Sequence, residues 1–111
     1  MNAIHVNTIK EWLFAHSNEP SPCLTVSQDP FLPLVVELEG DIMYVGYWRV
    51  ENGDLVPDPA VRVDISTMQG TVLTQICECE DDWYADSFLE LVEKRLSRAT
   101  QEEISTFAAL Q

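Results

Sequence analysis

Basic residues are scarce in this sequence. Its 111 residues contain 6 Lys and Arg against 19 Asp and Glu, which gives a net charge of −13. Nucleic acid and anionic lipid both repel such a charge, so the composition argues against direct binding to nucleic acid or to a membrane. Basic surfaces on other proteins are the favoured partners.

Glycine is scarce as well, and the four glycines stand at positions 40, 46, 53 and 70. That spacing excludes a glycine-rich phosphate loop. The sequence also lacks the His-Glu-x-x-His pattern of zinc proteases, a nucleophile elbow and the mixture of aromatic and basic residues typical of nucleic-acid binding. We therefore expect no cofactor and a non-enzymatic protein. An enzyme that uses paired carboxylates is the last of three hypotheses.

Long apolar runs and a disulfide framework are missing too. The run from Phe31 to Val36 is too short to span a membrane and contains a proline. The N-terminus has neither a basic region nor a long apolar stretch, so we expect no signal peptide. There are three cysteines, an odd number, and Cys77 and Cys79 are too close in sequence for an unstrained bond. Reduced thiols and a cytoplasmic location are the simplest interpretation.

The histidines and cysteines do not fit a metal site. His5 and His16 are eleven residues apart, which is roughly 16 Å along a helix, so one ion cannot bind both. Cys77 and Cys79 lack the further ligands of a structural zinc site. We expect no bound metal.

Apolar residues, by contrast, are plentiful. They make up 46% of the chain, far more than a disordered acidic tail contains. We expect a single small acidic domain over residues 1–111, of the α+β class. The predicted order is an N-terminal helix (3–16), a four-stranded antiparallel β-meander (34–39, 42–50, 61–65 and 71–79) and two C-terminal helices, with the helices packed on one face of the sheet.

The turns and helix boundaries come from local signals. Asn52-Gly53 predicts a tight hairpin turn, and residues 54–59 predict a bulged loop because their prolines lack N–H donors. Apolar spacing predicts a helix from about Asp82 to Arg98. Thr100 and Glu103 form a capping box that predicts a short terminal helix carrying Ile104, Phe107 and Ala108. The expected core is Ile9, Leu13, Val36, Leu38, Val63, Ile65, Phe88, Leu89, Val92 and Leu96.

Residues 34–38 read Leu-Val-Val-Glu-Leu, and residues 47–59 read Tyr-Trp-Arg-Val-Glu-Asn-Gly-Asp-Leu-Val-Pro-Asp-Pro. Together with the following strand, they resemble a small uncharacterised domain family of plasmids and conjugative elements. The resemblance covers about a third of the chain. Glu51 stands where the family usually has Gln, and Gly46 where it usually has His. The resemblance implies a mobile-element or phage setting and carries no activity.

The acids supply the candidate site. Residues two apart on a strand share a face, so Glu37 lies beside Glu39, and Glu78 beside Glu80. Carboxylates on neighbouring strands then have separations close to those of nucleic-acid phosphates. The predicted partner-binding residues are Glu37, Glu39, Asp41, Glu78, Glu80, Asp81 and Asp82.

The leading hypothesis is a protein-binding inhibitor, an acidic nucleic-acid mimic of anti-CRISPR or antirestriction type that occupies a basic groove of a host protein. The alternative is a small acidic secretion-type chaperone or adaptor. The other interpretation of the acids is that they only keep the protein soluble.

An apolar patch around Tyr44, Trp48 and Trp83 favours a homodimer. The sequence does not decide whether Tyr47 and Trp48 face the core or a partner. The only basic cluster (Lys94, Arg95 and Arg98) complements the helix dipole.

Overall fold

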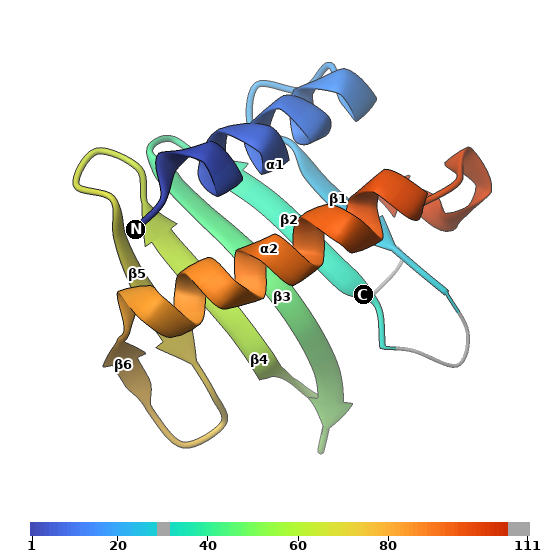
Figure 1. Cartoon of the computed structure of the whole chain (residues 1–111). Helices are drawn as coiled ribbons and strands as arrows, with labels where there is room; N and C mark the ends of the chain where they lie inside the picture. Colours follow the sequence, from blue (N-terminus) through green and yellow to red (C-terminus); the bar gives the residue numbers. More distant parts are fainter. Residues whose placement is uncertain (29–31, 107–111) are drawn as a thin grey trace.

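The computed structural model describes residues 1–28 and 32–106, which form an α+β fold (Figure 1). In chain order the elements are α1 (Ala3–His16), β1 (Cys23–Val26), β2 (Leu34–Glu39), β3 (Ile42–Glu51), β4 (Asp54–Asp64), β5 (Gln69–Leu73), β6 (Glu78–Glu80), α2 (Asp82–Arg98), the 3-10 helix η1 (Gln101–Glu103) and β7 (Ile104–Thr106). The α+β class agrees with the sequence.

The strands form one antiparallel sheet, whose order is β6-β5-β4-β3-β2-β1-β7. The expected four-stranded meander is therefore wrong, because the described residues form a sheet of seven strands. The predicted strand 71–79 is divided into β5 and β6 by a turn, in which the Thr74 amide donates to the Cys77 carbonyl at 3.0 Å. β1 has four residues and β7 has three, too few for an alternating pattern to stand out.

The prediction of a second C-terminal helix is also wrong. The Thr100 amide donates to the Glu103 carboxylate at 2.8 Å, so the capping contact forms, but only the short η1 follows it. Ile104 then begins β7, which pairs with β1 from Val26↔Ile104 to Leu24↔Thr106. Pairing satisfies donors and acceptors that β1 would otherwise expose at the sheet edge. Phe107 and Ala108 lie outside the described residues.

Residues 54–59 belong to β4 and are not the loop that their prolines suggested. Only the later part of β4, Ala60–Asp64, pairs with β5. Pro57 and Pro59 therefore lie where one edge of the strand is free, and there a missing N–H donor costs little. Gly46 pairs with Ala60 and Trp48 with Pro57, so Asp58 and Pro59 together oppose Tyr47. The expected bulge exists, inside a strand.

Local contacts fix where the two helices begin. The Asn2 side chain accepts a hydrogen bond from the Ile4 amide at 2.9 Å and caps α1. The Asp81 carboxylate accepts from the Tyr84 amide at 2.9 Å and caps α2. Each cap satisfies a donor that has no partner within the helix.

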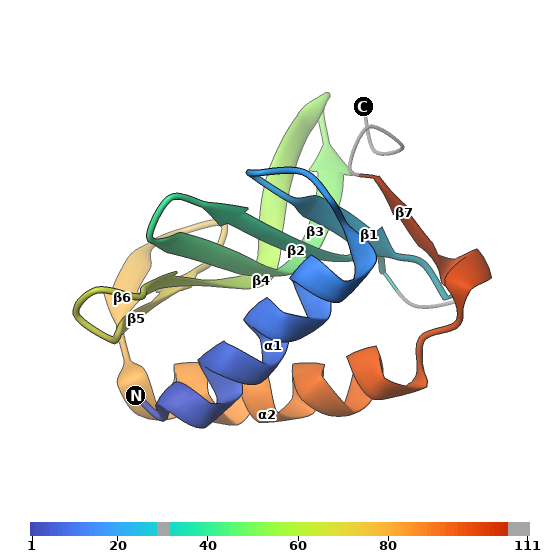
Figure 2. The same cartoon turned by 90° about the horizontal axis from the view of Figure 1, so that it is seen from above.

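Both helices pack on the same face of the sheet, and the tip of the β3–β4 hairpin bends away from them (Figure 2). The buried core between the two layers contains nine of the ten expected residues, and Ile65, the tenth, is partly buried against it. β1 adds Leu24 and Val26, and β3 adds Met43 and Val45. We call the sheet face opposite the helices the open face.

Candidate interaction face

The strand pairing decides which side chains lie on the open face. Val36 and Leu38 are buried under the helices, so Glu37 and Glu39 project to the opposite side. Directly paired residues in an antiparallel sheet share a side. One row across the open face is Cys23, Glu37, Tyr44, Arg62, Thr71 and Glu80.

Five strand acids share this face. Glu78 lies on this side because it pairs with Leu73, which in turn pairs with Ala60. Asp64 lies on this side because it pairs with Ile42, which in turn pairs with Glu39. Four of the predicted site residues, Glu37, Glu39, Glu78 and Glu80, therefore lie on one side of one sheet. They form two groups, on β2 and β6, separated by four strand spacings, or roughly 19 Å.

The centre of the open face is less acidic than its two sides. Tyr44, Arg62 and Thr71 lie between Glu37 and Glu80 in their row. The Arg62 guanidinium forms an ion pair with Glu78 at 3.3 Å, so it partly neutralises the β6 group. The β2 group is the stronger source of negative potential, and Asp41 in the adjacent turn adds to it.

Crowding alters the ionisation of two groups on the β2 side. Burial, and then repulsion from Glu39, raises the pKa of Glu37 above its ordinary value of 4.5. Burial, and then the nearby Glu37 charge, raises the pKa of Cys23 to about 12. At neutral pH the Cys23 thiol stays protonated and is a poor nucleophile.

The other two predicted site residues are engaged in folding contacts. Asp81 caps α2, as described above. The Asp82 carboxylate accepts a hydrogen bond from the Gly70 amide at 2.8 Å and ties the start of α2 to β5. Both lie at the junction between sheet and helix, and neither belongs to the strand rows of the open face.

The β3–β4 hairpin bends next to the bulge, where Gly46 of β3 lies directly against Ala60 of β4. A Cβ atom at Gly46 would lie 2.3 Å from the Ala60 Cα atom, a distance that no side chain tolerates. The absence of a side chain at Gly46 lets the two strands approach closely. Beyond the bend, Trp48 pairs with Pro57 and Val50 with Leu55, so these four residues form an apolar hairpin face that continues the open face.

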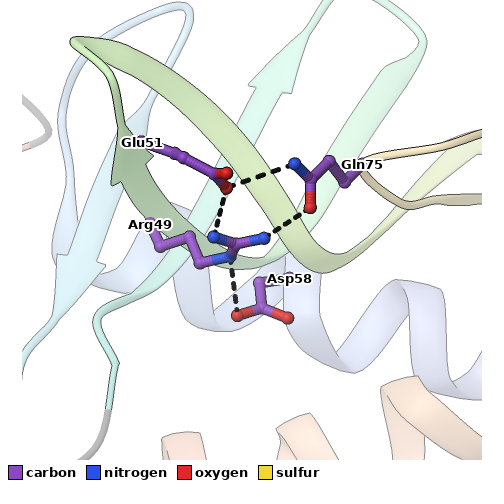
Figure 3. A network of polar contacts seen from close by, with 4 residues as sticks. All are labelled: Arg49, Glu51, Asp58 and Gln75. Carbon is purple, nitrogen blue, oxygen red and sulfur yellow. Dashed lines mark hydrogen bonds and ion pairs between the residues drawn. The ribbon is translucent and has the colours of Figure 1, made fainter.

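A polar network joins the hairpin to the loop between β5 and β6 (Figure 3). Arg49 forms ion pairs with Glu51 and with Asp58, the latter at 3.2 Å. Its guanidinium also donates to Gln75 at 2.6 Å, and Gln75 donates to Glu51 at 3.2 Å. Four side chains from three segments thus hold the hairpin in one orientation. Sequence reasoning missed this network, because Gln75 lies in a loop whose position only the fold defines.

Tyr47 and Trp48 face opposite sides of the sheet. Tyr47 contacts Phe88 of α2 with ring centroids 6.0 Å apart, so it belongs to the helix side. Trp48, its neighbour, lies on the open side. Trp83 lies in α2 and is 78% exposed, so the expected patch of Tyr44, Trp48 and Trp83 is not one surface. The expectation of a homodimer stays a prediction.

Within residues 1–28 and 32–106, no group of three or more His, Cys, Asp or Glu side chains is arranged to hold a metal ion. His5 lies 3.1 Å from Glu93 and joins α1 to α2. In the same part of the chain, none of the helices has the length and apolarity needed to cross a membrane.

Comparisons with protein-family models, curated proteins and solved structures gave no match. The resemblance to the plasmid domain family therefore stays a prediction.

Proposed function

We propose that this chain is a non-enzymatic protein-binding module that occupies a basic groove of a partner through its open face. In this proposal it acts in the cytoplasm as an acidic nucleic-acid mimic of phage or mobile-element type. One observation carries the proposal: five strand acids share a face that neither helix covers, and in the described part of the chain Arg62 is the only base in the strand rows with them.

The spacing of these acids supports a basic partner. Within each group the two acids are two residues apart on one strand, about 6.8 Å, and the two groups are four strand spacings apart, roughly 19 Å. Carboxylates at such separations can meet several lysines or arginines that normally hold phosphates. The resulting attraction should speed association and weaken steeply with salt.

The test compares two variants of equal net charge. Glu39→Lys with Glu80→Lys reverses one exposed acid on each side of the open face. Glu11→Lys with Glu90→Lys reverses two exposed acids on the helices. Wild-type and variant proteins are immobilised and exposed to a lysate of a bacterial host. The captured proteins are identified, and one that binds is purified for titration calorimetry.

We expect a nucleic-acid-binding protein that binds wild type and the helix variant, fails to bind the open-face variant, and is released by double-stranded DNA. Binding should weaken at least tenfold on reversal of the open-face acids, since two charge pairs become repulsive. Equal loss in both variants would show that only net charge matters. A partner that neither salt nor DNA displaces would exclude mimicry.

A second candidate is a chaperone or adaptor that binds an extended segment. The apolar hairpin face favours it, because Val50 is 66% exposed and Leu55 is 41% exposed. In this case Val50→Ser with Leu55→Ser should abolish capture, whereas the reversal of Glu39 and Glu80 should not. Binding should also resist salt, because apolar burial is not screened.

A further inference from the structure

A hollow lies on the helix side of the sheet, away from the open face. It has a volume of about 820 Å³ and is bordered by the later part of α2, by Gln28 and Leu32 between β1 and β2, and by Tyr47 and Asp58 of the β3–β4 hairpin. Pockets of this size commonly bind small organic molecules. Its walls combine the two kinds of group that such a molecule needs, apolar surface and a few fixed charges.

The basic residues of the chain are concentrated here. Lys94, Arg95 and Arg98 line the pocket, and they are half of the 6 Lys and Arg residues in the sequence. The helix dipole favours cations in this last part of α2. However, Lys94 and Arg98 are one turn apart, where like charges repel. The dipole explains why cations are tolerated there, but not why they converge on one hollow.

Arg95 is held in position by neutral groups. Its guanidinium donates to the Gln28 side chain at 3.0 Å and to the Leu32 carbonyl at 3.3 Å. It also lies over the Tyr47 ring, 5.2 Å from the centroid. These contacts fix the guanidinium without neutralising it, so the pocket contains a positive charge in a defined place.

Among residues 1–28 and 32–106, few carboxylates offset these charges. Asp58 also lines the pocket, but it pairs with Arg49. Glu103 has a lowered pKa, mainly because the Thr100 amide donates to it, with Arg95 as a smaller cause. Over residues 1–28 and 32–106, no acid lies within 4.0 Å of the charged nitrogens of Lys94 or Arg98.

The remaining walls are apolar and open to solvent. Leu32 is 40% exposed and Leu91 is 65% exposed, and both line the pocket beside the Tyr47 ring. Leu91 precedes Lys94 and Arg98 by three and seven residues, so all three lie on one stripe of α2. The stripe therefore presents an aliphatic chain next to two cations.

We propose that this pocket binds a free acyl-chain carboxylate, that is, a fatty acid of medium length. The chain packs against Leu32, Leu91 and Tyr47, and the carboxylate accepts hydrogen bonds from Lys94 and Arg98. A free molecule fits better than a lipid in a bilayer, because the net charge of −13 repels an anionic membrane.

Titration calorimetry with sodium decanoate, below its micelle concentration, tests the proposal. Decanol serves as the uncharged ligand of the same chain length. Lys94→Gln with Arg98→Gln removes two positive charges from the pocket, and Lys10→Glu lowers the charge by the same two units on α1, so both variants have the same net charge. Both pocket residues are exposed, and circular dichroism checks that each variant is folded.

We expect wild type to bind one decanoate per chain and to bind decanol at least tenfold more weakly. The pocket variant should lose at least tenfold in affinity, and the matched variant should keep wild-type affinity. Leu91→Asp should weaken binding as well, because it places a carboxylate against the chain.

Three outcomes would overturn the proposal. The first is the absence of saturable decanoate binding to wild type. The second is equal affinity in the pocket variant and the matched variant, which would mean that Lys94 and Arg98 do not bind the carboxylate. The third is binding only to phosphatidylglycerol vesicles, which would indicate a membrane surface as the ligand. None of these results depends on the open face, so the proposed function is tested separately.

Discussion

The two faces of the sheet are built from the same strands but have opposite chemistry. On the helix side, β2 contributes Leu34, Val36 and Leu38, all of them at most 5% exposed. On the open side, the same strand contributes Glu37 and Glu39, which bear charge, and Val35, which is buried. Because successive side chains point to opposite sides of a strand, β2 supplies both a surface that is buried against the helices and a surface that bears charge.

This difference shows where selection for stability and selection for binding can act independently. Apolar burial on the helix side supplies the main favourable term in folding. Exposed charges on the open side contribute little to stability. The sequence can therefore accumulate acids on the open face without losing the fold, and the open face can change while the core stays the same.

The largest expected effect is on the helix side of this comparison. Leu89 of α2 is completely buried. We expect Leu89→Ala to lower the free energy of unfolding by about 2–5 kcal/mol, through lost burial and a residual cavity. The matched change on the hairpin, Val50→Ala, should alter it by less than about 0.5 kcal/mol, because Val50 is 66% exposed. Urea unfolding of both variants measures the contrast, and similar losses would mean that the hairpin is part of the cooperative core.

A smaller effect is expected at the bend between the sheet and the hairpin. Gly46→Ala should destabilise the protein by about 1–3 kcal/mol, because the new methyl group collides with the neighbouring strand. Adding Ala60→Gly should not restore stability, since the Ala60 Cα atom and the Pro59 carbonyl remain, 2.3 Å and 2.7 Å from the added Cβ. Recovery of stability in the double variant would show that the backbone contact relaxes and that only the two methyl groups conflict.

Much of the fold could be predicted where the signal is local. The stripe of Val6, Ile9 and Leu13 defines α1, and Asn52-Gly53 defines the β3–β4 turn, because spacing and turn chemistry need no distant partner. β1 and β7 could not be predicted, since each is short and forms mainly because the other completes its hydrogen bonds. Their signal lies in contacts between residues about 80 positions apart.

The candidate site was predictable to the same extent. Alternation places Glu37 beside Glu39 and Glu78 beside Glu80, but only the pairing of five strands places all four on one side. Arg62 was missed for the same reason, because its ion pair with Glu78 depends on that pairing. Asp81 has the spacing of a helix cap, and this role uses the carboxylate that the binding hypothesis also assigned to a partner.

The smallest expected effect concerns a charge on the open face and its pH dependence. The folded state raises the pKa of Glu37 above 4.5, through burial and then through repulsion from Glu39. A raised folded-state pKa means that the folded protein binds the proton more tightly than the unfolded chain does. The stabilisation linked to this group is therefore present below pH 4.5 and is lost as the pH rises through the raised pKa.

Glu37→Gln cannot ionise, so it removes that loss. We expect the variant to be more stable than wild type at pH 7 by less than about 1 kcal/mol, because the side chain is only half-buried and water screens its charge. At pH 4 the difference should shrink, since wild type is then largely protonated at this position. Glu90→Gln, an exposed change on α2, is the matched control and should show no such pH-dependent gain. Urea unfolding across this pH range measures both variants, and a gain that grows toward low pH would contradict the raised pKa.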